Sequence, residues 1–173
     1  RKYIFKIFQY ECYSSKDQKL ILDTFFQISK RRSPYIQSYK HISFIYEQKF
    51  TPTFSMRHIS TKTLANILAD PKELQEFSLE ELIQCFFAVS QGMSYLHSNL
   101  ICHGNLCPSN IIVDSVNQFY ISDFGLYPIK KLFMKEENLF NEYYKDPLMK
   151  YNQLSFINDV YSFGYLMCYV FIS

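Results

Sequence analysis

The sequence predicts an α+β fold in two lobes. The first part of the chain combines strand-like segments with one helix, and the second part is largely helical with a small hairpin. The 173 residues are enough for a substantial core, and they read most simply as one domain or part of one. Hydrophobic residues make up 48% and charged residues 20%, which is typical of a globular protein and not of a disordered chain.

The first part of the chain carries the strand-like segments and the helix. Tyr3–Tyr10 is rich in aromatic and β-branched residues, which favours a strand. Residues 17–30 place apolar side chains at helical spacing. Ser33-Pro34 ends this helix, because a residue before proline avoids the α region. Two further strands are expected over 36–49 and 53–59, joined by a turn near Thr51-Pro52.

The second part of the chain contains the clearest predicted element, a long helix that ends near His97. Ser78 followed three positions later by Glu81 forms a capping box at its start. A helix from about Phe156 onward is apolar on nearly all sides and is expected to be buried. The long helix has an apolar face made of Leu79, Leu82, Ile83, Phe86, Met93 and Leu96. Smaller elements are a helix over 63–68 and short strands over 111–114 and 119–122.

Three short motifs stand out in the second part of the chain. Residues 103–110 read HGNLCPSN, and residues 123–125 read DFG. Protein kinases have H-R-D-x-x-x-x-N followed by D-F-G. Residues 158–164 read NDVYSFG, which looks like the D-V-W-S-F-G helix start of the family. On these motifs the chain resembles the protein kinase superfamily, in its serine/threonine or tyrosine-kinase-like branch, over essentially its whole length.

The resemblance implies a two-lobed protein-kinase-like fold and one partial kinase-like domain over residues 1–173. The N-lobe is expected over about 1–58, from the lysine strand onward. The C-lobe is expected over about 59–173, through the start of the buried helix that contains Asp159. No glycine-rich loop precedes Lys6, and no late C-lobe helices follow. We therefore expect a domain truncated at both ends, as a fragment of a longer protein or a shortened gene model.

Several family positions keep their residue type, and the resemblance assigns them roles. It implies that Asn110 and Asp123 hold magnesium on the phosphates of ATP. Lys6 resembles the strand lysine of V-A-I-K, which pairs with the phosphates. Asp159 matches the aspartate that anchors the backbone of the catalytic loop. ATP and Mg are thus the cofactors that the resemblance implies.

Other positions depart from the family pattern. Asn105 stands at the place of the catalytic Asp, and losing a general base costs about 10²–10⁴ in rate. Cys107 replaces a lysine and so removes a positive charge from the transferring phosphoryl group. Gly104 replaces the Arg through which many kinases read a phosphorylated activation loop. Leu148 takes the place of the Glu of A-P-E.

The helix glutamate that pairs with the strand lysine in kinases also lacks an equivalent. Its position is expected near Asp23 or Thr24, and neither is Glu. Asp23 is a carboxylate one methylene shorter than Glu. A pair between Lys6 and Asp23 is therefore the arrangement that the sequence allows.

These departures favour a catalytically impaired pseudokinase with HGN in place of HRD. The H-G-N-x-C run is similar to that of the pseudokinase domain of Janus kinases, a group whose members can bind ATP while regulating a partner domain. Such a domain would bind ATP-Mg and act in signalling through conformation or partner binding. The first alternative is an active but slow Ser/Thr protein kinase that transfers the γ-phosphate of ATP to protein hydroxyls. The second is a scaffold that binds no nucleotide.

Composition excludes some partners and indicates a compartment. The net charge is +2 and basic residues are scattered, so nothing points to nucleic acid, and the expected partner or substrate is a protein. The longest apolar stretch, Val160–Ile172, is far below the roughly 20 residues of a membrane span. Five cysteines without C-x-x-C spacing suit reduced thiols in an intracellular, cytoplasmic protein.

Overall fold

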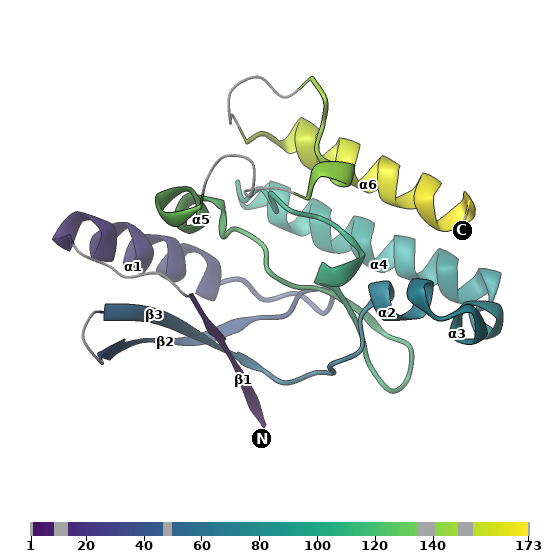
Figure 1. Ribbon diagram of the computed structural model, residues 1–173, viewed down its shortest axis with the longest axis horizontal. Coiled ribbons are helices and arrows are strands. Elements are labelled where there is room, and N and C mark those ends of the chain that lie inside the picture. Colours follow the sequence, from purple (N-terminus) through teal and green to yellow (C-terminus); the bar gives the residue numbers. More distant parts are fainter. Residues whose placement is uncertain (1, 9–13, 47–49, 135–140, 149–153, 173) are drawn as a thin grey trace.

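The computed structural model describes residues 2–8, 14–46, 50–134, 141–148 and 154–172. Within these ranges the chain forms one part with a sheet and a helix, followed by a larger helical part with a two-stranded hairpin (Figure 1). The fold is therefore α+β with two lobes, as the sequence predicts.

The first part is a three-stranded antiparallel sheet with helix α1 packed on it (Figure 1). The strands are β1 (Tyr3–Ile7), β2 (Tyr39–Tyr46) and β3 (Phe50–Arg57), in the spatial order β1-β3-β2. Helix α1 (Ser15–Ser29) begins after Ser14, whose side chain accepts a hydrogen bond from a backbone N–H of the first turn. The cap fixes where the helix starts, and the contact with the sheet fixes which face of the helix is buried.

Aromatic rings fill the space between α1 and the sheet. Phe54 of β3 is fully buried, and its ring centroid lies 4.9 Å from those of Phe8 and Phe25. Tyr39 of β2 is also fully buried and lies 5.8 Å from Phe54. All three contacts are edge-to-face, a geometry that aromatic pairs prefer over a face-to-face sandwich. These contacts hold α1 against the sheet, over β2 and β3.

The predicted turn near Thr51-Pro52 is wrong, because both residues lie inside β3. Pro52 has no N–H to donate, which is normally a problem in a central strand. Its carbonyl accepts a hydrogen bond of 3.0 Å from the backbone N–H of Phe8. The ring nitrogen faces the same side, toward β1, so the β2–β3 ladder loses no hydrogen bond, and the missing donor lies opposite Phe8, beyond the last residue of β1. Residues 9–10 of the predicted first strand and 47–49 of the second lie outside the described residues.

The second part is organised around two antiparallel helices, α4 (Leu79–Ser98) and α6 (Phe156–Ile172). His97, at the end of α4, meets the start of α6. Phe86, near the start of α4, lies 5.6 Å from a ring near the end of α6. The predicted capping box of α4 is present: the Ser78 hydroxyl accepts from the Glu81 N–H at 3.2 Å, and the Glu81 carboxylate accepts from the Ser78 N–H at 2.8 Å.

Several short elements connect these two helices to each other and to the sheet. The described residues place seven such elements in the second part: α2 (Leu64–Ala69), α3 (Pro71–Glu76), the 3-10 turn η1 (Pro108–Asn110), β4 (Ile111–Val113), β5 (Phe119–Ile121), α5 (Tyr127–Phe133) and the 3-10 turn η3 (Glu142–Tyr144). The two short strands pair antiparallel, with the backbone of Ile111 opposite that of Ile121.

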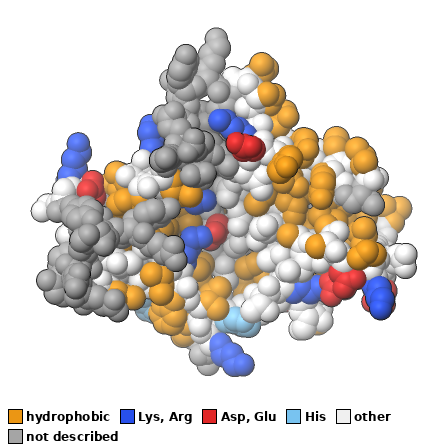
Figure 2. All heavy atoms as spheres, viewed as in Figure 1, with side chains coloured by type: hydrophobic (Ala, Val, Ile, Leu, Met, Phe, Trp, Pro, Cys, Tyr) orange, Lys and Arg blue, Asp and Glu red, His pale blue; other side chains and the backbone are white. Residues whose placement is uncertain are grey.

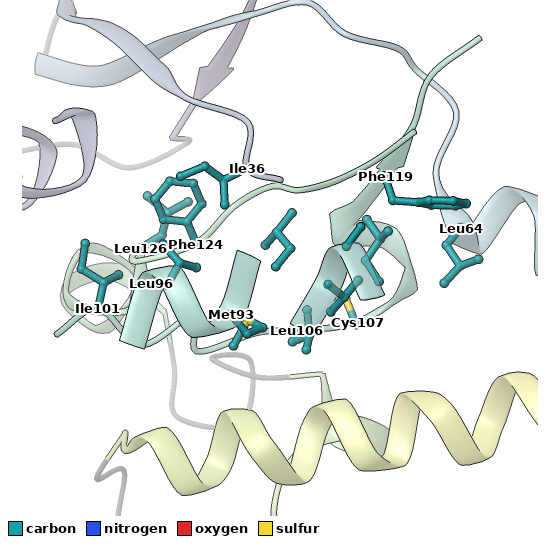
Figure 3. Packing of buried hydrophobic residues seen from close by; sticks show 14 of the residues in the cluster. Ile36, Leu64, Met93, Leu96, Ile101, Leu106, Cys107, Phe119, Phe124 and Leu126 are labelled. Atoms are coloured by element: carbon teal, nitrogen blue, oxygen red, sulfur yellow. The ribbon is translucent and has the colours of Figure 1, made fainter. Parts of the chain in front are cut away.

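The core of the second part lies where α4 meets the loop that follows it. Met93 and Leu96 of α4, Leu106 and Cys107 of the loop, and Phe124 further along the chain are all buried. Figure 3 shows these side chains packed around α4. The loop that carries HGNLCPSN is thus seated on the core and not on the surface.

The predicted apolar face of α4 is partly wrong. Leu96 is fully buried, but Leu79 is 62% and Ile83 is 58% exposed. Together with Phe87, which is 56% exposed, these residues recur every four positions and form a second, outward stripe. The buried positions of α4 are Cys85, Phe86, Ala88, Val89, Gly92, Met93 and Leu96.

The prediction that α6 is buried is also wrong for the described residues. Its Leu166 is fully buried, whereas Ile157 is 72%, Val160 63% and Ile172 85% exposed. The helix is apolar on nearly all sides, but α4 and η3 cover only the buried face. In the ranges that the structure describes, no helix combines the length and the apolar character needed to cross a membrane.

We expect the outward face of α6 to make the 173-residue chain express poorly and associate, because a large contiguous exposed apolar patch promotes aggregation. The double change Ile157→Lys and Val160→Lys should shift the protein toward the monomer in size-exclusion chromatography with light scattering. Val116→Lys is the matched control, since Val116 is 71% exposed but lies in the β4–β5 turn. A wild-type preparation that is monodisperse and melts cooperatively would contradict this expectation.

Candidate active site

One buried carboxylate holds the backbone of the HGN loop, the loop that begins with residues 103–105. Asp159 of α6 is 1% exposed. Its Oδ2 accepts a hydrogen bond of 2.7 Å from the backbone N–H of His103, and its Oδ1 accepts one of 2.8 Å from Gly104. His97 Nε2 of α4 lies 2.9 Å from the same Oδ2. The structure therefore confirms that Asp159 anchors the backbone of this loop.

Gly104 has a conformation that explains its residue type. Its φ is +77°, in the left-handed region that glycine adopts without steric cost. A Cβ atom at this position would also lie 3.0 Å from a methyl group of Leu154. An arginine at this place would meet both obstacles, so this loop is shaped for glycine.

Asn105, at the position of the catalytic base, is engaged in structural hydrogen bonds. Its side-chain Oδ1 accepts a hydrogen bond of 3.1 Å from the backbone N–H of Asn141. Its backbone carbonyl accepts one of 2.8 Å from the Asn110 amide. The carboxamide thus ties the segment before η3 to the loop, and it offers no group that accepts a proton near neutral pH.

Asn110 and Asp123 are brought together by backbone pairing. Asn110 is 8% exposed, and its carbonyl accepts hydrogen bonds from the Ser122 backbone N–H at 2.9 Å and from the Ser122 hydroxyl at 3.1 Å. Asp123 follows directly with a φ of +59°. This sharp turn directs the chain away from β5. The side chain of Asp123 remains 21% exposed. The two residues predicted to hold magnesium therefore lie near each other. One is the last residue of HGNLCPSN and the other is the first residue of DFG.

The residues after Asp123 are locked into the core. Phe124 is fully buried and its ring lies 5.3 Å from that of Tyr39, whose hydroxyl donates to the Phe124 carbonyl at 3.4 Å. Burial, with a smaller effect of Asp123, raises the pKa of Tyr39 well above its ordinary value, so the hydroxyl keeps its proton. Gly125 has a φ of +70°, and a Cβ there would lie 2.6 Å from a methyl group of Ile28 of α1. The DFG turn is therefore packed directly against α1.

Lys6 reaches this site from β1 and forms an ion pair with Asp123. The pair joins the sheet to the DFG turn across 117 positions of the sequence. The predicted alternative, Lys6 with Asp23, is wrong: Asp23 is exposed on α1, and the neighbouring Thr24 is the buried residue. Helix α1 thus turns a hydroxyl toward the interior where the sequence comparison expects an acid.

Lys130 is a residue of this site that sequence reasoning missed. It lies on α5, a helix that was not predicted and that packs against α1. Burial lowers the pKa of Lys130, while the Asp123 carboxylate opposes this effect and favours the ammonium form. The charge of Lys6 and the Cys107 thiol also act on the Lys130 amine. The only sequence signal for α5 is Pro128 in its first turn, followed by two lysines in its last turn.

The remaining polar groups of the site are neutral near pH 7. Cys107 is 4% exposed, and burial raises the pKa of its thiol above the ordinary value. Burial lowers the pKa of His103 to about 4, against an opposing effect of the Asp159 carboxylate. His103 Nδ1 accepts from the Asn105 N–H at 3.2 Å, while the buried Nε2 has no partner among the described residues.

A magnesium ion would find a small set of oxygen ligands here. The Asn110 amide group donates to a carbonyl, which leaves its Oδ1 available, and Asp123 supplies one carboxylate. Mg²⁺ is often bound by one or two carboxylates with the rest of its shell from phosphates and water. The described residues contain no group of three or more His, Cys, Asp or Glu that could hold a metal ion. The residues fit magnesium that arrives with a polyphosphate, and not a resident ion.

We expect Asp159→Asn to lower the free energy of unfolding by about 3 kcal/mol. The amide would point an N–H₂ group at backbone donors that now have a carboxylate partner. Urea denaturation measures the change. Asp23→Asn, an exposed position on α1, is the control and should change stability by less than about 0.5 kcal/mol. Equal effects of the two changes would show that Asp159 does not anchor the loop.

The protonation of His103 should make stability depend on pH. Its pKa is about 4 when folded and near 6.5 when unfolded, so the unfolded chain binds more protons between these values. Stability is therefore fully present above pH 6.5 and is lost as the pH falls toward 4, by about 3 kcal/mol. The measurement is the unfolding free energy of the wild type minus that of His103→Asn across this window. A constant difference would contradict the prediction.

Comparison with known proteins places this site in a family. A family model described as "Protein tyrosine and serine/threonine kinase" matches residues 4–173. Megakaryocyte-associated tyrosine-protein kinase of Mus musculus is 31% identical over 116 residues, which are 67% of this chain and 23% of that protein. Probable serine/threonine-protein kinase drkD of Dictyostelium discoideum is 35% identical over 82 residues, 46% of this chain and 6% of that protein. Serine/threonine protein kinase OSK3 of Oryza sativa subsp. indica is 32% identical over 89 residues, 50% of this chain and 17% of that protein.

The chain spans less than a quarter of the length of each of these relatives. The family match nevertheless covers nearly all of its residues, from the strand of Lys6 through the helix of Asp159. With the HGN loop, the DFG turn and the anchoring carboxylate in their expected arrangement, the chain belongs to the protein kinase superfamily.

Proposed function

We propose that this protein kinase domain binds ATP but is catalytically impaired. The observation that carries the proposal is the combination at one site of the Lys6–Asp123 pair with an amide, Asn105, at the position of the base. Lys6, Asn110 and Asp123 supply a charge and two oxygen ligands suited to polyphosphate and magnesium. The group that would take the proton from a substrate hydroxyl is the one that has been replaced.

Nucleotide binding would use residues already in position. Lys6 extends from β1 to Asp123 and would pair with phosphate oxygens. Asn110 Oδ1 and the Asp123 carboxylate would hold magnesium, which neutralises charge on the phosphates when it is bound. Because Asp123 is ion-paired with Lys6, the phosphates and Asp123 would share the charge of this lysine.

Catalysis would be impaired for two reasons at neighbouring positions. The Asn105 carboxamide accepts no proton near neutral pH, and its oxygen already accepts a hydrogen bond from Asn141. Cys107 is a buried neutral thiol where a cation would stabilise the transferring phosphoryl group. Loss of the base alone costs about 10²–10⁴ in rate.

A domain that binds ATP but transfers phosphate poorly would act in signalling through conformation or partner binding. The named relatives include both tyrosine and serine/threonine kinases, so either kind of protein hydroxyl is a candidate for any residual transfer. We propose the cytoplasm as the place of action. The support is chemical: of the described cysteines, Cys85, Cys102, Cys107 and Cys168 are free thiols, which suits a reducing compartment.

A binding experiment tests the first half of the proposal. In isothermal titration calorimetry with ATP and magnesium, we expect saturable binding by the purified protein. Lys6→Met and Asp123→Asn should each weaken it by about tenfold or more, because each removes a charged partner of the phosphates or the metal. Lys2→Met, an exposed lysine outside β1, should leave it unchanged. A well-folded wild type that binds no ATP would instead favour the scaffold alternative.

A transfer assay tests the second half. Phosphoryl transfer to a general protein substrate should lie at least about 100-fold below that of an active kinase. Asn105→Asp should raise it, since a carboxylate can still accept the hydrogen bond from the Asn141 N–H. Asn105→Leu, which loses that bond, controls for effects on the fold. Substantial transfer by the wild type would favour the slow-kinase alternative, in which positioning and electrostatics replace the base.

A further inference from the structure

Four tyrosines of the helical part line one cavity, and we call them the tyrosine cage. Tyr143 and Tyr144 come from η3, whereas Tyr165 and Tyr169 come from α6. The two elements are in contact, and Figure 1 shows η3 beside α6. The cavity has a volume of about 370 Å³, within the roughly 300–1,000 Å³ of ligand pockets. It is therefore large enough to admit a long side chain or a small organic ion.

The rings of the tyrosine cage meet at steep angles. The ring centroid of Tyr144 lies 5.1 Å from that of Tyr165 with an interplanar angle of 83°, and 6.3 Å from that of Tyr169 with an angle of 72°. Tyr165 and Tyr169 are four positions apart, so they lie on the same face of α6. Tyr144 is only 7% exposed, whereas Tyr143 is 75% exposed. The cage therefore has a buried floor, walls at nearly right angles and an open mouth.

Hydrogen bonds of the surrounding residues hold the cage in place. The Ser162 hydroxyl of α6 donates to the Tyr144 carbonyl at 2.6 Å, which ties η3 to the helix. Asn141 caps η3, since its side-chain oxygen accepts a hydrogen bond of 3.2 Å from the Tyr143 N–H. The Asn141 N–H in turn donates to the Asn105 side chain of the HGN loop. The cage is thus formed before any ligand binds, and it adjoins the loop where kinases have their base.

The surroundings of the cage favour a cation. Burial raises the pKa of Tyr144, so this phenol is neutral near pH 7. Glu142, Lys145 and Asp146 flank the two tyrosines of η3 with one positive and two negative charges. Asp159 is the one charged residue of α6, and Figure 2 shows hydrophobic side chains gathered over this helix. The charges of these segments sum to a negative value, and the faces of aromatic rings are also negative.

We propose that the tyrosine cage binds the methylated ammonium group of a lysine side chain presented by a partner protein. A cation close to the face of a tyrosine ring is attracted by it, and cages of aromatic rings bind quaternary ammonium groups in this way. An unmodified lysine ammonium is strongly hydrated, and the described lining has no carboxylate to replace the water that it would lose. Methylation keeps the charge and adds apolar groups that the rings can bury.

The partner is a protein in this proposal because the family to which the chain belongs acts on proteins. The cage also adjoins the HGN loop, through the Asn105–Asn141 hydrogen bond. None of the residues proposed to hold ATP lines the cavity. Binding at the cage and binding of ATP can therefore be tested separately, and either one can fail without the other.

The test is an NMR titration of the purified protein with a pentapeptide that has trimethyllysine between pairs of glycines. We expect saturable binding and an upfield shift of the N-methyl protons, because aromatic rings shield protons above their faces. The same peptide with unmodified lysine should bind at least about tenfold more weakly. Choline should also bind, and its neutral isostere 3,3-dimethyl-1-butanol should bind at least about fivefold more weakly, because it has the same shape without the charge.

Substitutions on α6 connect the binding to the cage. Tyr169→Leu should weaken binding of the trimethyllysine peptide by about tenfold or more, whereas Tyr169→Phe keeps the ring and should stay within about threefold of the wild type. Phe171→Leu is the matched control, since Phe171 is a 58% exposed aromatic residue of the same helix that does not line the cavity. It should leave binding unchanged. Tyr169 is 45% exposed, so its variants should melt like the wild type and titrate with ATP as the wild type does.

Four results would overturn the proposal. Equal binding of the trimethylated and unmodified peptides would show that the cage does not select methyl groups. Equal binding of choline and its neutral isostere would show an apolar pocket without preference for a cation. Equal effects of Tyr169→Leu and Phe171→Leu would place the binding outside the cage. Binding of choline without binding of the trimethyllysine peptide would show that the ligand is a free quaternary ammonium compound and not a protein.

Discussion

The hydrogen bonds of the Asp159 carboxylate determine the shape of the whole site. This one buried group accepts from the backbone of His103 and Gly104 and contacts His97, so it joins α6, the HGN loop and α4. The loop that it holds continues to Asn110, whose carbonyl receives the Ser122 backbone and hydroxyl. Through this chain of bonds the position of the DFG turn depends on a buried carboxylate of α6.

The frame of the site is that of a kinase, but its charges are different. Binding a polyphosphate requires positive charge and metal ligands, whereas transferring a phosphoryl group also requires an acceptor for a proton. Lys6 supplies a positive charge beside Asp123, and Asp123 supplies a carboxylate oxygen. Asn105 removes the proton acceptor, and its oxygen has become part of the fold through Asn141. The Asn105 side chain therefore makes a structural contact at the position where kinases have their base.

Local patterns predicted the parts of the fold that depend on local chemistry. The capping box of Ser78 and Glu81 located the start of α4, because both of its hydrogen bonds form within one helical turn. The resemblance to the kinase family implied that Asn110 and Asp123 share one site, and the short β4–β5 hairpin between them brings them together. The role of Asp159 was implied by the resemblance of residues 158–164 to the kinase family, and it is confirmed by the contacts of its carboxylate.

Features set by contacts between distant segments were not predicted. Lys6 pairs with Asp123, and not with Asp23, because α1 is rotated so that Thr24 faces inward. Helix α5 was missed because it is short, and with it the location of Lys130. The composition of α6 indicated burial on all sides, but coverage depends on which neighbours are present, and Ile157 is 72% exposed.

We propose that this site binds ATP and leaves it intact. The most direct measurement follows the fate of bound ATP in a single turnover, with excess protein, magnesium and a protein substrate, on a sample whose ATP binding has been measured at equilibrium. We predict that the bound nucleotide is recovered as ATP over a time in which an active kinase would consume all of it. Transfer of the γ-phosphate to protein hydroxyls at the rate of an active kinase would contradict the account.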